Sequence, residues 1–177
     1  MLCSTIRDIL VLTEKEYGAE DAIRYKKSKN EIEAKSYTDL KQDSESFSNA
    51  LQALSADGGH VAMTGATSYQ WIVTYMGIVN SGRVAVPLDV SLPLEDMLEL
   101  IDRSDATVFV ADAVRADVLA VVKERCPKIE YVISMVAEES DDNMLSFWQL
   151  LREHEGACDY QPQPDQLATI MFTSGTT

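Results

Sequence analysis

Cysteine and histidine, the side chains that most often hold metals or cross-link a chain, are scarce in this sequence. There are three cysteines and two histidines among 177 residues, and no two cysteines have the Cys-x-x-Cys spacing. Metal sites and disulfide frameworks need such residues in close, regular clusters. The sequence therefore favours reduced thiols with structural or incidental roles. The residues concerned are Cys3, Cys126, Cys158, His60 and His154.

Long hydrophobic runs are also absent. No apolar stretch approaches the ~18 residues that a membrane-spanning helix needs. The stretch Ile9–Leu12 near the amino terminus is too short for the core of a signal peptide, and charged residues surround it at helical spacing. The sequence predicts a cytoplasmic protein with no integral membrane segment.

Basic residues are few in comparison with acidic ones. The chain has 15 Lys and Arg against 29 Asp and Glu, which gives a formal net charge of −14. A surface of this charge repels nucleic acids and anionic lipids, so we expect neither as a partner. A phosphate site is not excluded, because it needs only local hydrogen-bond donors.

The composition that remains is that of a globular domain, with 46% hydrophobic and 25% charged residues. The length suits one domain with a real core. Thr5–Tyr17 has the spacing of an amphipathic helix, and Ala22–Lys27 with Glu31–Tyr37 alternates as a β-hairpin does. We expect one α/β subdomain over residues 1–177, with this helix and hairpin in 1–37 and a layered α/β core in 38–177.

Strand and helix patterns alternate five times after Tyr37. Strands such as Ala106–Asp112 are apolar on both faces, which requires a largely parallel sheet with helices on both faces. The fold class predicted is therefore α/β, doubly wound. The strands expected are His60–Gly65, Val84–Asp89, Ala106–Asp112, Ile129–Met135 and Leu167–Phe172.

The helices between these strands have recognisable ends. Thr38 is a candidate cap for the first helix of the core, and Thr67 with Gln70 is a candidate capping box for the second. Gly82 is expected to end that second helix. The remaining expected features are a helix first turn at Pro93, a helix capped by Asp112 and buried through Val114, Val118, Val121 and Val122, and a helix over Met144–His154.

The chain ends in a strand pattern followed by a Ser/Gly/Thr cluster, "LATIMFTSGTT" (Leu167–Thr177). Open α/β sheets bind ligands at the carboxyl ends of their strands. Ser and Thr hydroxyls donate hydrogen bonds, and Gly175 lets backbone N–H groups turn toward an anion. A polyphosphate is the predicted ligand, although the loop lacks the lysine of a Walker-type "GK[ST]" motif.

Three stretches in order, "YTDL" (Tyr37–Leu40), "VNSGRVAVPLD" (Val79–Asp89) and the terminal one, resemble motifs of the acyl-CoA synthetases among the AMP-binding, adenylate-forming enzymes. Residues 65–101 also resemble the long-chain fatty acid–CoA ligase branch. The resemblance runs from about Tyr37 to Thr177. This sequence departs from the motifs at three positions: Asp39 replaces a Glu, Val86 an aromatic residue and Phe172 a Tyr.

The resemblance implies an activity and its site. Thr173, Ser174, Gly175, Thr176 and Thr177 would cradle the β- and γ-phosphates of ATP, with Thr173 near Mg²⁺. In the family, a carboxylate attacks the α-phosphate and releases pyrophosphate, and coenzyme A then displaces AMP from the acyl-adenylate. A long-chain fatty acid is the acid that the resemblance favours.

The resemblance also implies that this chain is the amino-terminal part of a longer enzyme. The family's loop lysine, metal-binding glutamate, acyl tunnel and mobile carboxyl-terminal domain would all lie beyond Thr177. No catalytic residue is therefore assigned within the chain, and the chain alone is expected to be inactive. A cut surface would favour self-association into a homo-oligomer.

Other functions stay open at this stage. Within the family, peptide-synthetase adenylation modules and aryl- or acetyl-CoA ligases are alternatives. Outside it, the chain could be a non-catalytic α/β module that binds a nucleotide or a protein.

Several conspicuous residues have simpler explanations than a binding site. Trp71, Tyr75 and Met76 have the spacing of core residues on a helix. The acidic stretch Ala137–Asn143 lacks the alternating ligand spacing of a Ca²⁺ loop and is expected to be solvated. Asp89 is expected to form a turn. His60 is expected at the surface.

Overall fold

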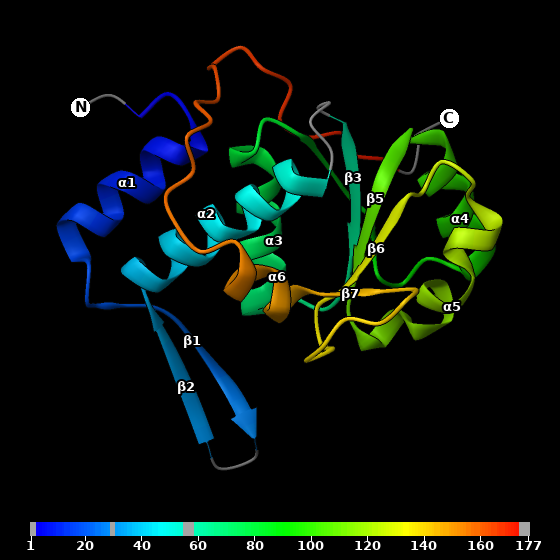
Figure 1. Cartoon of the computed structure of the whole chain (residues 1–177), viewed down its shortest axis with the longest axis horizontal. Helices are drawn as coiled ribbons and strands as arrows, with labels where there is room; N and C mark the ends of the chain where they lie inside the picture. The colour runs from blue at the N-terminus through cyan, green and yellow to red at the C-terminus, as the bar shows by residue number, and fades with distance from the viewer. Residues whose placement is uncertain (1–2, 29–30, 55–58, 174–177) are drawn as a thin grey trace.

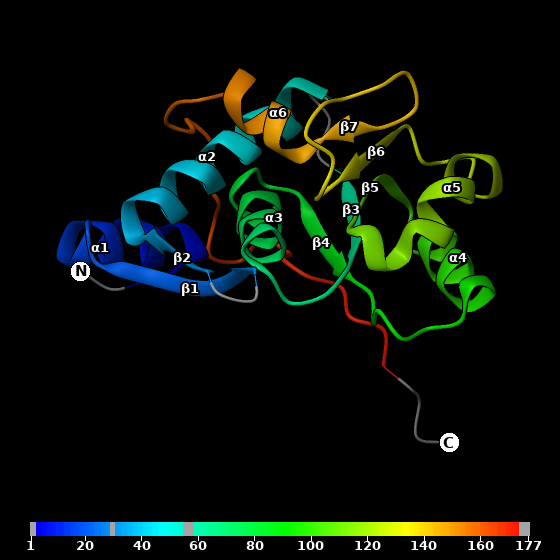
Figure 2. The ribbon, with the colours of Figure 1, turned by 90° about the horizontal axis from the view of Figure 1, so that it is seen from below.

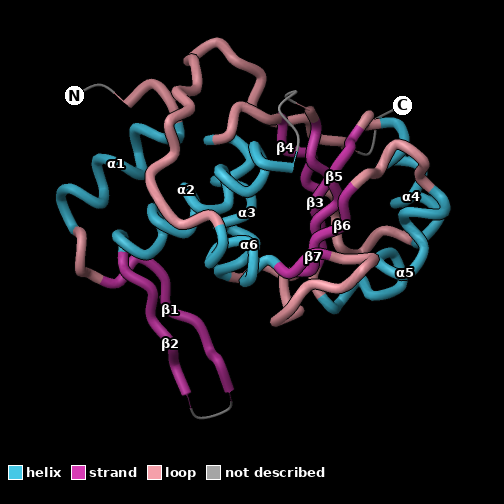
Figure 3. Tube along the Cα trace, viewed as in Figure 1, coloured by secondary structure: helices cyan, strands magenta, loops and turns pink. Residues whose placement is uncertain are grey.

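The structure is a computed structural model, and it describes residues 3–28, 31–54 and 59–173. A five-stranded sheet with the order β4-β3-β5-β6-β7 forms its centre, and every neighbouring pair in it is parallel. A separate antiparallel hairpin, β1-β2, projects from the body (Figures 1 and 3). The strands are β1 Asp21–Ser28, β2 Glu31–Ser36, β3 His60–Thr64, β4 Val84–Pro87, β5 Ala106–Ala111, β6 Tyr131–Ser134 and β7 Leu145–Ser146.

Helices cover both faces of the sheet, as Figure 2 shows from below. The helices α2, α3 and α6 pack on one face, with α1 outside them, and α4 and α5 pack on the other. None of the described helices combines the length and apolar character needed to cross a bilayer. The helices are α1 Ile6–Tyr17, α2 Tyr37–Leu54, α3 Tyr69–Asn80, α4 Leu94–Arg103, the 3₁₀ turn η1 Ala113–Arg115, α5 Ala116–Arg125 and α6 Phe147–Glu153.

Successive side chains of the central strands point into two different apolar cores, one on each face of the sheet. This arrangement confirms the predicted α/β class. In β3, Val61 and Met63 point into the core beneath α2, α3 and α6, whereas Ala62 belongs to the core beneath α4 and α5. In β5, Val110 and Phe109 divide in the same way. Because successive side chains of a strand point to opposite faces, a strand that is apolar throughout needs a helical layer on each side.

Two predicted helix caps are wrong by one or two residues. The cap of α3 is Ser68, whose Oγ accepts a hydrogen bond from the backbone N–H of Trp71 at 3.1 Å, so the predicted box at Thr67 does not form. At the start of α2, the Oγ of Ser36 accepts from the N–H of Asp39 at 3.1 Å, and the Asp39 carboxylate accepts from the N–H of Ser36 at 2.8 Å. Ser36, and not Thr38, therefore caps α2.

Two further predictions need correction. Asp112 caps the short turn η1 rather than a long helix, and Val114 is 63% exposed. Arg115 is buried in its place, with its guanidinium donating to the carbonyl oxygens of Val90 and Leu92. The helix expected from Met144 begins only at Phe147, because Leu145 and Ser146 join the sheet as β7 and Ser146 caps α6.

Candidate functional site

The segment that leads to the Ser/Gly/Thr cluster runs along the free edge of β4. The N–H of Ala85 donates to the carbonyl of Ala168, and the N–H of Ile170 donates to the carbonyl of Ala85, each at 2.9 Å. The contact is parallel but consists of a single bridge, between Ala85 and Thr169. The predicted strand Leu167–Phe172 is therefore wrong as a full strand.

The reason is that this segment has a neighbour on one side only among the described residues. A strand at the edge of a sheet keeps its ladder only where register and burial both support it. Here Ile170 packs into the second core, whereas Leu167 and Met171 are 56% and 71% exposed. Such an apolar edge is the kind of surface through which self-association was expected, and that association stays a prediction.

Thr173 lies where the sequence predicts a ligand loop to begin. Because the segment runs parallel to β4, it leads to the carboxyl edge of the sheet, and Thr173 is exposed there. It lines a groove of about 530 Å³ together with Phe172, the end of β4 and the exposed side of α4. The other lining residues are Pro87, Leu88, Asp89, Leu92, Asp96, Glu99, Leu100 and Arg103. Ser174, Gly175, Thr176 and Thr177 lie outside the described residues, so their contact with phosphate stays a prediction.

Among the described charged residues of this groove, the carboxylates of Asp89, Asp96 and Glu99 outnumber the single cation Arg103. The Asp89 carboxylate accepts hydrogen bonds from the backbone N–H and the hydroxyl of Ser91, both at 2.8 Å. These bonds stabilise the charged form and lower the pKa of Asp89, and they confirm the turn predicted there. The cation Arg103 is paired with Glu99 at 3.3 Å.

An unchelated polyphosphate would therefore meet repulsion in the groove, and Mg²⁺ bound to the phosphates would relieve it. Within the described part of the chain, no group of three or more His, Cys, Asp or Glu residues could hold a metal ion. Mg²⁺ typically binds proteins through one or two side chains together with substrate phosphates. The groove would suit a magnesium ion carried by a nucleotide, and a role for Thr173 near such an ion stays a prediction.

Two side-chain hydrogen bonds hold the connector, the loop that precedes this segment and contains Tyr160 and Gln166. The amide Nε2 of Gln166 donates to the carbonyl of Gly82 at 2.6 Å, and the hydroxyl of Tyr160 donates to Oε1 of Gln166 at 3.0 Å. Gly82 has φ +80°, and a Cβ there would lie 2.2 Å from Cζ of Tyr160. Gly82 follows the end of α3 as predicted, and its bare Cα also makes room for the Tyr160 ring. The sequence pattern gave no signal for Tyr160 or Gln166.

Tyr75 contacts the segment along β4 directly, through Thr169. Its hydroxyl lies 2.8 Å from Oγ1 of Thr169, and its ring stacks on Trp71 with a centroid distance of 5.8 Å and an interplanar angle of 2°. Trp71, Tyr75 and Met76 pack against the main core, as predicted, although all three are only partly buried. No sequence pattern indicates the bond to Thr169.

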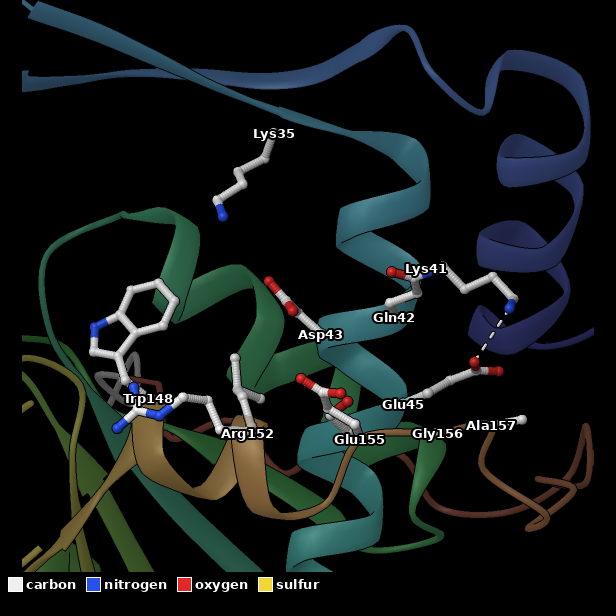
Figure 4. A pocket seen from close by; sticks show the side chains of 12 residues that line it. Lys35, Lys41, Gln42, Asp43, Glu45, Trp148, Arg152, Glu155, Gly156 and Ala157 are labelled. Carbon is white, nitrogen blue, oxygen red and sulfur yellow. Dashed lines mark hydrogen bonds and ion pairs between the residues drawn. The ribbon is translucent and has the colours of Figure 1, made fainter. Parts of the chain in front are cut away.

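A second and larger hollow lies between β2, α2 and α6 (Figure 4), with a volume of about 840 Å³. Asp43 projects into it and accepts a hydrogen bond from the hydroxyl of Tyr69 at 2.6 Å. The ammonium of Lys35 lies 5.3 Å from the centre of the Tyr69 ring. Trp148, Arg152 and Glu155 also line the hollow, so its charged residues are of both signs.

The titration of Asp43 is set mainly by its burial. Partial burial raises the pKa of Asp43, and the hydrogen bond from Tyr69 and the charge of Lys35 oppose this rise. Burial also raises the pKa of the neighbouring Tyr25 to about 12. Both signs of charge line the hollow, so it does not select an anion as the predicted loop does.

Two other predictions, for His60 and for the acidic loop, can be compared with the structure. His60 is partly buried, and its Nδ1 is in hydrogen-bond contact with the carbonyl of Ser104, so the predicted surface position is wrong. The ring reaches Ser104 because His60, at the start of β3, pairs with Ala106 at the start of β5. The acidic residues Glu138, Glu139, Asp141 and Asp142 are exposed, as predicted.

Comparison with known proteins shows the family to which this chain belongs. A family model described as "AMP-binding enzyme" matches residues 13–177. The chain belongs to the AMP-binding enzyme family.

Individual relatives and solved structures are also similar to this chain. A crotonobetaine/carnitine–CoA ligase of Escherichia coli is 26% identical over 166 residues, which are 91% of this chain and 32% of the relative. The solved anthranilate CoA ligase AuaEII, in complex with anthranoyl-AMP, matches 98% of this chain and 33% of its own with a TM-score of 0.85 at 18% identity.

A third comparison is with a fatty acyl CoA synthetase of Mycobacterium tuberculosis. It matches 97% of this chain and 33% of its own, with a TM-score of 0.78 at 18% identity. The two structural comparisons show the shared fold. This chain spans about a third of the length of the relatives it matches.

Proposed function

We propose that a polypeptide carrying this chain is an ATP-dependent acyl-CoA ligase. In the first step, a carboxylate oxygen attacks the α-phosphorus of ATP, the bond between that phosphorus and the α,β-bridging oxygen breaks, and pyrophosphate leaves with the electron pair. In the second step, the sulfur of coenzyme A attacks the acyl carbon and AMP leaves. The observation that carries the proposal is the position of Thr173, at the carboxyl edge of the sheet in a chain of the AMP-binding family.

The chemistry explains why a donor-rich loop is needed at this edge. A carboxylate is a poor acylating agent until its oxygen becomes part of a good leaving group, which AMP supplies. Negative charge develops on the leaving pyrophosphate, and preorganised donors stabilise it best. Thr173, Ser174, Gly175, Thr176 and Thr177 would supply hydroxyl and backbone donors. Magnesium bound to the phosphates would neutralise further charge.

A long-chain fatty acid is our proposed substrate class, on the resemblance of residues 65–101 to that branch. The relative named for crotonobetaine and carnitine favours a smaller, polar acid as the competing substrate. Formation of an acyl-adenylate without transfer to coenzyme A, as in adenylation modules, is the competing reaction.

The test is acid-dependent exchange of pyrophosphate into ATP by the complete product of the gene. The acid panel contains fatty acids of graded chain length, an aryl acid, acetate, crotonobetaine and carnitine. We expect exchange that is highest with long-chain acids, and thioester formation when coenzyme A is added. Exchange without thioester would replace the ligase by an adenylation module, and no exchange with any acid would contradict the proposal.

A further inference from the structure

If the proposed function holds, the predicted phosphate loop must be kept in position by contacts of the segment that precedes it. Thr173 is four residues beyond Thr169, and Ser174–Thr177 follow it directly. Whatever positions Thr169 therefore sets the point from which the loop starts.

Apolar packing holds the two neighbours of Thr169, Ala168 and Ile170, against the two cores, but few hydrogen bonds hold the segment. The backbone of its segment makes two hydrogen bonds to β4, both to the single residue Ala85. Because both bonds meet at one residue, they define the direction of the segment less well than a longer ladder would. The hydrogen bond between the hydroxyls of Thr169 and Tyr75, at 2.8 Å, comes from α3 and adds a contact away from Ala85.

Tyr75 is itself rigidly placed. It lies on α3, whose neighbouring residues Val73 and Thr74 are fully buried, and its ring is stacked almost parallel to that of Trp71. Aromatic stacking adds to the burial of both rings and limits their rotation. The Tyr75 hydroxyl is thus presented at a fixed point beside the β4 edge.

We propose that Tyr75 is a positioning residue for ATP binding. Its hydroxyl, acting through Thr169, fixes the direction in which the chain leaves β4 and enters the phosphate loop. It touches neither the nucleotide nor the reacting atoms. Reaction rates and nucleotide affinity respond steeply to displacements of about 1 Å in such positioning groups.

The contact can be tested in the 177-residue chain without any activity. In Tyr75→Phe, which removes only the hydroxyl, we expect amide hydrogen exchange at Ile170 to become several-fold faster, because that amide is bonded to Ala85. Exchange in β3 and β5 should stay unchanged. Thr169→Val should have the same effect, and the double variant should add nothing to it.

The matched control is Tyr131→Phe. Tyr131 is a partly buried tyrosine of β6 whose hydroxyl makes no hydrogen bond to a described residue. Exchange at Ile170 should not change in this variant. If Tyr75→Phe and Tyr131→Phe behave alike at Ile170, the proposal is overturned.

The functional test uses the complete gene product in the exchange assay. We expect Tyr75→Phe to raise the KM for Mg·ATP roughly fivefold to tenfold, with a much smaller change in the KM for the acid and in the thermal midpoint. A general loss of stability would instead affect both substrates and the midpoint together. An active parent with an unchanged KM for Mg·ATP in the variant overturns this inference alone. An inactive parent overturns the proposed function and the role of Tyr75 with it.

Discussion

At the scale of single residues, the contact between Gly82 and Tyr160 shows how a glycine can be required for two reasons. Its φ of +80° lies in the region that side chains disfavour, and the Tyr160 ring occupies the space that a Cβ would need. The ring in turn places Gln166, which binds the carbonyl of Gly82. One small residue thus helps to hold the connector that leads to the phosphate loop.

Gly82→Ala should lower the free energy of unfolding by about 2–4 kcal/mol, since backbone strain and a steric clash act together. Urea denaturation of the 177-residue chain measures the change. The matched control is Gly156→Ala, where φ is +134° but no atom lies within 4 Å of the added Cβ. If the two variants lose equal stability, the clash with Tyr160 contributes nothing and the interpretation is wrong.

Asp43 should make stability depend on pH. Its pKa is raised in the folded state, mainly by burial, so the folded protein binds a proton there more tightly than the unfolded chain does. The stability associated with this group is present below the ordinary carboxyl pKa of ~4 and is lost as the pH rises through the higher folded value.

Asp43→Asn removes this titration but keeps an oxygen that can accept from Tyr69. We therefore expect the variant to gain stability relative to the parent as the pH rises above ~4. The measurement is urea denaturation of both proteins between about pH 3 and pH 7. A difference in unfolding free energy that stays constant over this range would contradict the interpretation.

At the scale of elements, the sequence predicted the four strands β3, β4, β5 and β6 and most helices because hydrophobic periodicity reports burial directly. The alternation in Val61–Met63 and the spacing in α4 are visible in the sequence alone. The exact caps were not predictable, because neighbouring Ser and Thr side chains offer the same oxygen and tertiary packing decides which one is used.

Prediction of the candidate site from the sequence was limited in the same way, because some of its contacts depend on tertiary packing. The position of Thr173 at the carboxyl edge followed from a general rule about α/β sheets. The bond from Tyr75 to Thr169 joins residues 94 positions apart, and no local pattern indicates such a pair. The predicted strand at Leu167–Phe172 was wrong because a strand depends on its neighbours as well as on its own residues.

The corrected cap of α3 gives a test at this scale. Ser68→Ala should cost about 1 kcal/mol of stability, since the N–H of Trp71 loses its partner. Thr67→Ala, one residue earlier, is the matched control and should change the unfolding free energy by less than about half as much. Thermal or urea unfolding of both variants separates the two assignments, and a larger loss in Thr67→Ala would restore the capping box first predicted.

At the scale of the whole molecule, the chain has the fold of its family over about a third of its relatives' length. The resemblance implies that the family's loop lysine, metal-binding glutamate and acyl tunnel lie outside these 177 residues. We therefore expect the purified 177-residue chain to show no pyrophosphate exchange above background with any acid. Exchange by this chain would mean that the catalytic groups lie within it.

In the proposed function, the residues from Thr173 to Thr177 bind the phosphates of ATP. The most direct measurement is acid-dependent pyrophosphate exchange by the complete gene product and by its Thr173→Val variant, which removes one hydroxyl and keeps the size of the side chain. We predict that the parent exchanges and that the variant is at least about tenfold slower at low Mg·ATP concentration. A parent that exchanges with an unchanged variant would contradict the assignment of Thr173, and a parent that binds no Mg·ATP would contradict the account as a whole.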